Sequence, residues 1–397
     1  MKPVFLWSVL KVIQVQSPAR TFYFVAAEAS GDLLAAETIV ALRALGLDAP
    51  IFATGGAELA KHAEMSGIDV APLSVLGLWE GVRAYADVTR LAEEAAADIL
   101  SSGATHVVLV DSWGFCLRVA QKVRASDPTI KLTKLIGPQV WATRAGRAKT
   151  LASAVDHLLC IHDFEVPYYA PHGLDVHVIG HPALSRAERV EGGVYRRSCG
   201  LSADAPLIAI FPGSRTSEIA RVAPSLIEAG RQLVAAAPDR RVVVAPAQSV
   251  RDIFHDQFPD LPENWIFLED ETERFGAMAA ADIALACSGT VTSEIAVQGT
   301  PVITGYKTGA VTWALVKHVL MKADYITLLN MAAGSMVVPE LLQGSFSGQA
   351  IAGLAENLLG DAQASERQIA AQNDALAKMG YGARAAPELA AEILLGL

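Results

Sequence analysis

Short runs of β-branched and aromatic residues alternate with longer Ala-rich stretches along most of the chain. In the first half this pattern predicts strands at 21–27, 50–54, 105–111, 131–136, 157–161 and 176–179, with helices at 33–45, at 79–100, from about 115 and after 141. After a polar stretch from about 187 to 205, further strands are expected at 207–211, 241–245, 265–268, 283–286 and 302–304. Strands that alternate with helices predict parallel sheets with crossover helices, so we expect an α/β protein with two doubly wound, Rossmann-like units.

The same pattern suggests where the domains begin and end. We expect an N-terminal extension at 1–20, a first Rossmann-like domain at 21–186 and a second at 187–360. The Ala-rich helices at 361–397 either pack back on the first domain or pair with another subunit, which would make a homodimer. Ligands of open parallel sheets bind beyond the carboxyl ends of the strands, so the expected site is a central cleft that the two domains face.

Composition excludes several classes of protein. The chain has 397 residues, of which 52% are hydrophobic and 19% charged, so it is neither disordered nor a small stapled scaffold. Its net charge of -10 argues against a nucleic-acid partner. The four cysteines form no Cys-x-x-Cys pair, which favours a reducing cytosol over a zinc ribbon or a redox dithiol. The apolar stretch at 4–15 is too short to span a membrane and has no cleavage signal, so we interpret it as an extra N-terminal arm or a misplaced start.

The first predicted strand runs into a polar turn that carries candidate chemistry. Ser30 and Asp32 either cap the following helix or bind a ligand, and the pattern does not separate the two roles. Glu28 caps nothing obvious, and a carboxylate at the carboxyl end of a strand faces the predicted cleft. Glu28 is therefore a candidate catalytic residue.

A second turn, after the strand at 207–211, is a candidate phosphate site. Gly213 lets the backbone approach closely, Ser214 lies beside the amino end of a helix, and Arg215 supplies a fork of charged donors. The alternative is an ordinary capped helix in which Arg215 pairs with Glu218.

A third turn of the same kind follows the strand at 283–286. Ser288, Gly289 and Thr290 could hold a second phosphate, and Glu294, one turn into the helix, could accept hydrogen bonds from a ribose diol. Two such turns in one half of the chain suit a nucleotide diphosphate.

Other nucleotide and metal motifs are missing from the sequence. It has neither a Gly-x-x-x-x-Gly-Lys-Ser/Thr loop nor a Gly-x-Gly-x-x-Gly turn, and it lacks an Asp-x-Asp pair that would hold a metal under a diphosphate. We interpret the acidic run at 269–271 as a solvated loop, and His157 and His162 flank a strand without ligand spacing. We therefore expect no metal and no cofactor. His181 follows a strand and either contacts a sugar or phosphate, or serves in acid–base work, or hydrogen-bonds within its turn.

Together these motifs resemble those of lipid-A-disaccharide synthases. The resemblance runs in order through most of the chain and rests on Glu28–Asp32, Gly137–Ala142, Gly180–Pro182, Pro212–Arg215, Ser288–Thr290 and Pro301–Gln343. It implies a glycosyltransferase of the two-domain B fold (GT-B) that joins UDP-2,3-diacylglucosamine to 2,3-diacylglucosamine 1-phosphate. The products would be a β-1,6-linked lipid A disaccharide and UDP. The enzyme would work without metal or cofactor, peripherally at the cytoplasmic face of the inner membrane.

The resemblance also implies roles for individual residues. UDP would be held by Arg215, Ser288, Gly289, Thr290 and Glu294, and the acceptor would lie near Glu28, Ser30, Asp32, Trp141 and Arg144. Asn330 belongs to the stretch 325–340, which resembles the family's segment near the donor sugar.

One departure from the family concerns the catalytic base. The family usually has Asp-x-Pro-Asp-Phe, whose second carboxylate is thought to be the base, whereas this chain has Gly114 at that position. Either Asp111, our preferred substitute, or Glu28 acts as the base, or the chain is a non-catalytic or repurposed relative that binds UDP-sugars or lipids. A UDP-sugar epimerase is a further, less favoured alternative.

A candidate membrane contact lies at 311–322, where Trp and aliphatic residues alternate with Lys in a predicted helix. The alternative is a core helix with solvated lysines.

Overall fold

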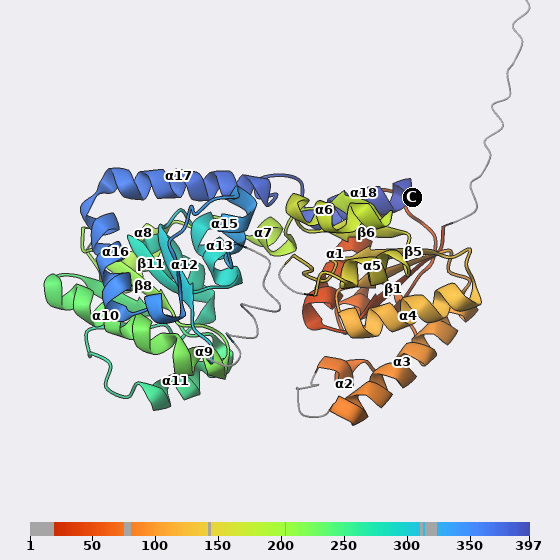
Figure 1. The fold of residues 1–397 in the computed structure, drawn as a ribbon, viewed down its shortest axis with the longest axis horizontal. Coiled ribbons are helices and arrows are strands. Elements are labelled where there is room, and N and C mark those ends of the chain that lie inside the picture. The colour runs from red at the N-terminus through yellow and green to blue at the C-terminus, as the bar shows by residue number, and fades with distance from the viewer. Residues whose placement is uncertain (1–19, 75–80, 142–143, 203, 310–312, 314–323) are drawn as a thin grey trace, which may run out of the picture. The chain divides into compact units, whose positions relative to one another are not determined.

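The computed structural model describes residues 20–74, 81–141, 144–202, 204–309, 313 and 324–397. Within them, seven strands form a first sheet in the order β3-β2-β1-β4-β5-β6-β7 (Figure 1). These strands are β1 (Phe22–Ala26), β2 (Ile51–Thr54), β3 (Glu64–Met65), β4 (His106–Val110), β5 (Lys131–Leu135), β6 (His157–Cys160) and β7 (Asp175–Val178). The described helices that precede β8 along the chain are α1 (Ala29–Ala44), α2 (Ala71–Ser74), α3 (Gly81–Ser102), α4 (Trp113–Ser126), α5 (Arg147–Ala152), α6 (Val166–Tyr169), α7 (Pro182–Arg186) and α8 (Gly192–Ser198).

A second sheet has six described strands in the order β10-β9-β8-β11-β12-β13. They are β8 (Leu207–Phe211), β9 (Arg241–Val244), β10 (Ile266–Phe267), β11 (Ile283–Cys287), β12 (Val302–Tyr306) and β13 (Glu340–Leu342). The described helices that follow β8 along the chain are α9 (Thr216–Arg221), α10 (Ala223–Ala236), α11 (Arg251–Gln257), α12 (Arg274–Ala280), α13 (Thr290–Val297), α15 (Leu328–Ala333), α16 (Gly348–Gly360), α17 (Ala362–Lys378) and α18 (Ala386–Gly396). The two doubly wound α/β sheets expected from the sequence are therefore confirmed.

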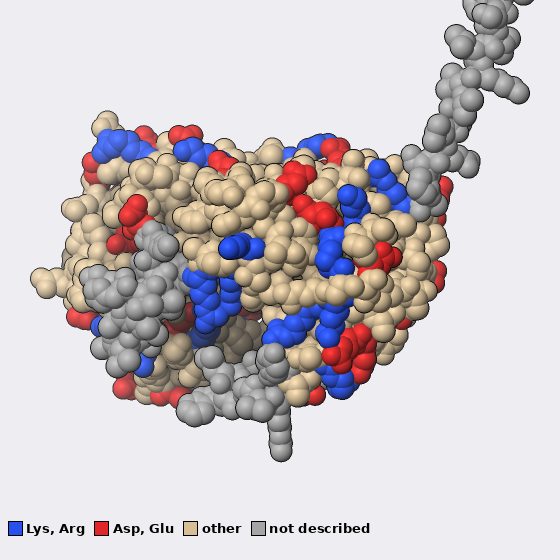
Figure 2. Space-filling model, turned by 45° about the vertical axis from the view of Figure 1, so that its right-hand side comes forward, with Lys and Arg blue, Asp and Glu red and all other residues tan. Residues whose placement is uncertain are grey.

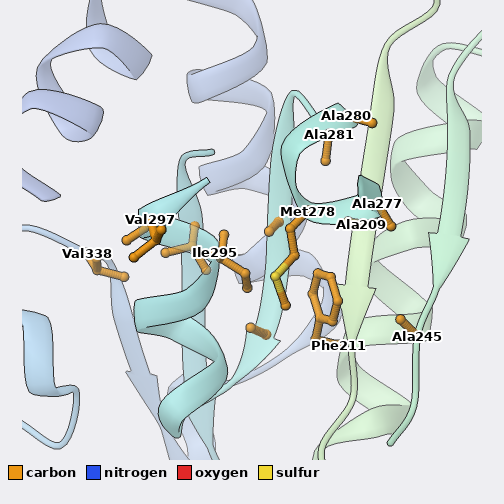
Figure 3. Close-up of a cluster of buried hydrophobic side chains, with 14 of the residues drawn as sticks. Ala209, Phe211, Ala245, Ala277, Met278, Ala280, Ala281, Ile295, Val297 and Val338 are labelled. Atoms are coloured by element: carbon orange, nitrogen blue, oxygen red, sulfur yellow. The ribbon is translucent and has the colours of Figure 1, made fainter. Parts of the chain in front are cut away.

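Strands covered on both faces explain why the central strands have uninterrupted apolar sequences. All five residues of β8 are buried, and they alternate between two hydrophobic clusters. Phe211 packs with Met278 and Ile295 on the face that α12 and α13 cover (Figure 3). Ile208 and Ile210 pack on the opposite face, which α10 and α16 cover.

The strand order places a switch point in each sheet. In the first sheet the chain adds β2 and β3 on one side of β1 and then returns to add β4 on the other, with Ala26 opposite Val110 in parallel register. In the second sheet β8 and β11 are related in the same way, with Phe211 opposite Ala286. The loops that leave two such neighbouring strands diverge to opposite faces, and the gap between them is the usual place for a ligand.

By its internal contacts the chain divides into two compact units. One ends at Lys134 and also contains Ala154–Asp156, and the other contains Leu135–Ser153 and His157–Leu397. The domain boundaries expected at 20, 186 and 360 stay predictions.

The surface charges and the lengths of the helices bear on whether the protein contacts or crosses a membrane. In Figure 2, basic and acidic side chains are both scattered over a face made mostly of other residues. None of the helices in the described part of the chain is both long and apolar enough to cross a bilayer. The candidate membrane contact at 311–322 lies almost wholly outside the described residues.

Two buried glutamines fasten α17 to the second sheet. Gln368 donates to the carbonyl of Val302 at 2.7 Å, and Gln372 donates to the carbonyl of Thr300 at 3.0 Å. The amide of Val302 donates in turn to Gln372 at 3.3 Å. Helix α18 contacts α7. The expectation that 361–397 returns to the first domain stays a prediction.

We predict that Gln372→Ala lowers the free energy of unfolding by about 2 kcal/mol, because it leaves buried backbone groups without partners. Gln363→Ala is the matched control, since Gln363 is an exposed glutamine of the same helix. Thermal unfolding of both variants checks this. An equal Tm for the two would show that the buried amide contributes nothing.

Candidate functional site

A cavity of about 360 Å³ lies at the carboxyl edge of the second sheet. It is lined by the turn after β8, the turn after β11 and the start of α12. Its lining includes Gly213, Ser214, Arg215, Glu218, Arg274, Ser288, Gly289, Thr290, Val291 and Glu294. The structure therefore brings together the six residues predicted to bind UDP, which lie in two segments more than seventy positions apart.

The turn after β11 leaves the amino end of α13 open toward this cavity. The N-cap residue is Gly289, and no side chain caps the helix. The first amides of a helix have no partner within it, so those of Thr290 and Val291 are available to an acceptor in the cavity. The positive end of the helix dipole adds to the attraction for an anion there.

The turn after β8 is built differently, because its amides are already occupied. The side chain of Glu218 accepts from the amide of Ser214 at 2.8 Å and from that of Arg215 at 3.2 Å. Its other oxygen pairs with the Arg215 guanidinium at 2.9 Å. Of the two alternatives for this turn, the structure shows the capped helix with an Arg215–Glu218 pair. The glycine at 213 is required by this carboxylate, since a β-carbon there would lie 2.6 Å from it, at a φ of +122°.

The Arg215 side chain nevertheless remains accessible to a ligand. It is 73% exposed, whereas that of Glu218 is only 5% exposed. The charge of Glu218 raises the pKa of Arg215, so the guanidinium stays charged at every relevant pH.

Sequence reasoning missed Arg274, which also lines the cavity. Its guanidinium pairs with Glu294 at 2.7 Å and with Glu271 at 3.3 Å. Burial raises the pKa of Glu294, and the charge of Arg274 opposes that shift. The signal was present in the sequence, because a lone arginine follows the acidic run at 269–271. That run is partly solvated, as expected, but Glu271 also helps to hold Arg274 in place.

At the switch point of the first sheet, two carboxylates approach a buried lysine. Lys134 is 2% exposed and donates to the backbone carbonyls of Leu109, at 3.2 Å, and of Asp111. Burial lowers the pKa of Lys134, and the nearby groups that oppose this shift include Asp111 and Glu28. Burial and the charge of Asp111 raise the pKa of Glu28, against the effect of Lys134. Glu28 is therefore a stronger base than an ordinary glutamate.

The backbone of this turn adopts a conformation that L-residues rarely take. Asp111 has φ of 46° and Ser112 has φ of 36°, so two successive residues other than glycine lie in the left-handed region. The Lys134 ammonium holds the Asp111 carbonyl in that arrangement. Gly114 lies in the first turn of α4, and a β-carbon added there would meet only the Arg118 guanidinium, at 3.7 Å. Position 114 therefore has room for a side chain larger than that of glycine.

Asp32 and Ser30 differ in their surroundings. Asp32 is 6% exposed and accepts from the amides of Gly56, at 2.7 Å, and Glu58, at 2.8 Å, which fastens the loop after β2 to α1. Ser30 is exposed at the start of α1. Neither side chain caps this helix, whose N-cap residue is Glu28. Of the two, only Ser30 presents its side chain to solvent, so only it is open to a ligand without rearrangement.

Trp141 and Arg144 are close in sequence but differ in solvent exposure. Trp141 is 6% exposed and packs edge-on against Phe164, with ring centroids 5.7 Å apart. Arg144 is exposed, and its charge helps burial to lower the pKa of Arg147. Two neighbouring guanidinium groups of this kind suit an anionic ligand better than an apolar one.

His181 acts as the N-cap of α7 in a fixed tautomer. Its Nδ1 accepts from the amide of Ala183 at 3.2 Å, so the ring proton of the neutral form is on Nε2. Burial and the charge of Arg186 lower the pKa of His181 to about 4. At neutral pH this side chain is an uncharged donor rather than a cation. Of the roles considered for His181 from the sequence, the structure shows the hydrogen bond within its turn.

Asn330 is buried, and the protein uses its whole amide group. Its nitrogen donates to the carbonyl of Val338 and to Glu340, and its oxygen accepts from the amides of Val337 and Val338, at 2.8 to 3.3 Å. These bonds tie α15 to β13. Any effect of Asn330 on a sugar would therefore come through the shape of this segment.

Comparison with solved structures defines the class of protein. The chain resembles a UDP-N-acetylglucosamine 2-epimerase from Listeria monocytogenes, with a TM-score of 0.60, 12% identity and 94% of each chain covered. It also resembles MurG of Acinetobacter baumannii, with a TM-score of 0.58, 15% identity, and 96% of this chain and 100% of the other covered. The fold is that of the GT-B glycosyltransferases.

Sequence comparison then identifies the family. Residues 22–394 match the family model of lipid-A-disaccharide synthetase. The lipid-A-disaccharide synthase of Rhodospirillum centenum is 30% identical over 94% of both chains. The chain therefore belongs to the lipid-A-disaccharide synthetase family, and it is a glycosyltransferase of that family.

The lowered pKa of His181 predicts how stability depends on pH. The unfolded chain binds a proton at this histidine below a pKa of about 6.5, whereas the folded protein does so only near 4. Stability is therefore lost as the pH falls from about 6.5 toward 4. His181→Asn keeps an N-cap side chain and should lose less stability than the wild type between pH 7 and pH 5.

Thermal unfolding at several pH values checks this prediction. His172→Asn, at an exposed histidine, is the control and should follow the wild type. A His181→Asn curve parallel to that of the wild type would contradict the prediction.

Proposed function

We propose that this glycosyltransferase transfers the sugar of UDP-2,3-diacylglucosamine to 2,3-diacylglucosamine 1-phosphate. The acceptor hydroxyl would attack the anomeric carbon, a β-1,6 bond would form, and the bond to the diphosphate would break to release UDP. The observation that carries the donor half of this proposal is the uncapped amino end of α13 in a cavity with two arginines. Family membership supports the acylated substrates.

In this proposal the diphosphate lies on the α13 side of the cavity. The buried Glu218 carboxylate occupies the amides of the α9 turn and would repel a second anion there. The amides of Thr290 and Val291 and the hydroxyl of Ser288 would bind the phosphate oxygens. The exposed Arg215 guanidinium would rotate from Glu218 toward the diphosphate, and its charge would stabilise the leaving group.

Glu294 and Arg274 would define the nucleoside side of the same cavity. Glu294 lies one turn into α13 and would accept hydrogen bonds from the ribose diol, as the sequence suggested. Arg274 fixes the orientation of that carboxylate through the 2.7 Å ion pair. No metal is required by this arrangement, because helix amides and guanidinium groups supply the positive charge.

The proton of the acceptor hydroxyl would pass to one of the two carboxylates of the first sheet. Asp111 lies at the end of β4, close to the position of the family's usual base, and Glu28 has the raised pKa. Burial and the negative charge of Asp111 make Glu28 more basic, which favours proton uptake by Glu28. Turnover measurements on Asp111→Asn and Glu28→Gln distinguish which of the two carboxylates accepts the proton.

The remaining parts of the proposal concern location and partners. An enzyme with two acylated substrates would work peripherally at the cytoplasmic face of the inner membrane. Neither a nucleic acid nor a cofactor belongs to the proposed reaction. A homodimer stays a prediction from the C-terminal helices.

A second candidate function is binding of a UDP-sugar or lipid without transfer. The specific observation in its favour is Gly114, which cannot accept a proton. Turnover assays of the wild type and of Gly114→Asp separate this function from catalysis.

We predict that the purified chain releases UDP when both acylated substrates are present and not with the donor alone. A positioned base contributes about 10²–10⁴ in rate. Gly114→Asp should therefore raise turnover about 100-fold or more, because the β-carbon position is open and no refolding is needed. Gly114→Asn is the matched control, since it has the same size without a base.

The outcomes of this assay separate the alternatives. No UDP release from a folded wild type, with release by Gly114→Asp, would support the binding-only alternative. Conversion of the donor without any acceptor would support an epimerase.

We also predict that Gly289→Ala weakens UDP binding tenfold or more, equivalent to about 1.4 kcal/mol. The added methyl meets no protein atom within 4 Å, so the fold should survive, but it enters the proposed phosphate site. Gly213→Ala is the contrasting variant, and it should lower the Tm because its methyl collides with Glu218. Calorimetric titration with UDP and thermal unfolding check both. Unchanged UDP affinity in Gly289→Ala would rule out the α13 site.

A further inference from the structure

Three potential metal ligands converge at the amino end of β6 and β7. They are His157, Asp175 and His177, and in the described part of the chain no other group of this kind is found. Sequence spacing alone does not predict them, because the ligands come from two strands rather than from one motif.

The parallel register of these strands fixes their common face. His157 pairs with Asp175 across the two strands, and His177 is two residues further along β7. Side chains two apart on a strand point to the same face, and so do side chains at paired positions. The backbone therefore places all three side chains on one face of the sheet.

The distances are those of a single coordination sphere. The Asp175 Oδ2 atom lies 2.9 Å from His157 Nδ1 and 3.1 Å from His177 Nε2. All three ligand atoms lie within 4.8 Å of one another. Ligand atoms in a tetrahedral zinc site are about 3.3 Å apart, given zinc bonds of about 2.0–2.1 Å. Small side-chain shifts are enough to admit an ion.

The exposure of the group leaves room for a fourth ligand. The side chain of His157 is 15% exposed, that of His177 33% and that of Asp175 53%. The imidazoles are thus partly anchored, while the carboxylate faces solvent and a water molecule can complete the site.

We propose that His157, Asp175 and His177 bind one divalent transition-metal ion of the zinc class. Two imidazoles and one carboxylate suit Zn²⁺, Co²⁺ or Ni²⁺ and not the hard ions Mg²⁺ and Ca²⁺. One nitrogen of each ring is within hydrogen-bond distance of Asp175. A change of tautomer at each neutral ring would move its proton to the outer nitrogen and direct a lone pair at the ion.

The bound ion would tie β7 to the rest of the sheet. β7 is the last strand of its sheet, and none of its four residues is buried. It therefore has little apolar packing of its own. An ion shared with His157 of β6 would cross-link the two strands and stabilise the folded state by mass action.

The test uses the untagged full chain, treated with EDTA and then freed of it. Calorimetric titration with ZnCl₂ should show one site per chain, with a Kd in the micromolar range or below, and Zn²⁺ should raise the Tm. MgCl₂ should do neither. Co²⁺ should give the visible absorption of a nitrogen and oxygen site without thiolate charge-transfer bands, which excludes binding at the four cysteines.

Two variants and a control make the result specific. His177→Ala and Asp175→Asn should each weaken zinc binding at least tenfold and remove the rise in Tm that Zn²⁺ causes in the wild type. His172→Ala, at an exposed histidine close in sequence, should bind as the wild type does. The proposal would be overturned if the wild type did not bind zinc, or if the two ligand variants bound zinc as tightly as the wild type does.

Discussion

The strand order is the constraint on which the rest of the molecule depends. Because the chain reverses its direction of growth at β1 and β4, and again at β8 and β11, the loops after these strands diverge and leave a gap at the sheet edge. At each switch point, residues far apart in sequence are thereby brought together. Most residues proposed for the transfer reaction follow one of these four strands or line the cavity in the second sheet. The exceptions are His181, Trp141, Arg144 and Asn330. The central strands in turn must be apolar on both faces to carry such loops.

Buried charge is managed in opposite ways at the two switch points. In the first sheet a buried ammonium, that of Lys134, is satisfied by backbone carbonyls and by neighbouring carboxylates, and it holds a backbone that would otherwise be unfavourable. In the second sheet a buried carboxylate, that of Glu218, is satisfied by backbone amides and one guanidinium. Each site therefore contains a charge that serves the turn and a more exposed charge that is available to a ligand.

The sequence predicted the fully buried strands most closely, and it missed two short strands at the sheet edges. Strands such as β4 and β8 are covered on both faces, so their apolar runs are uninterrupted and their ends were predicted to within one or two residues. The edge strands β3 and β13 were missed, because two exposed residues in β3 and three half-buried residues in β13 leave no hydrophobic signal.

For the site, the turns could be found because glycine and hydroxyl residues between a buried strand and a helix are typical of anion-binding turns. What the sequence could not show is which partner each polar group takes. Whether Arg215 meets a phosphate or Glu218, and whether Arg274 reaches Glu294, depends on distances of a few ångströms between side chains.

The capping carboxylate of Glu218 has a consequence for selectivity among small anions. The Glu218 carboxylate occupies the amides before α9, so inorganic phosphate or sulfate cannot bind them. The Arg215 guanidinium is paired with the same carboxylate until a larger anion displaces it. Only an anion that also engages the neighbouring helix gains enough to draw that arginine away. At the turn after β8 the protein's own carboxylate thus excludes small inorganic anions, while the amino end of α13 stays open in the same cavity.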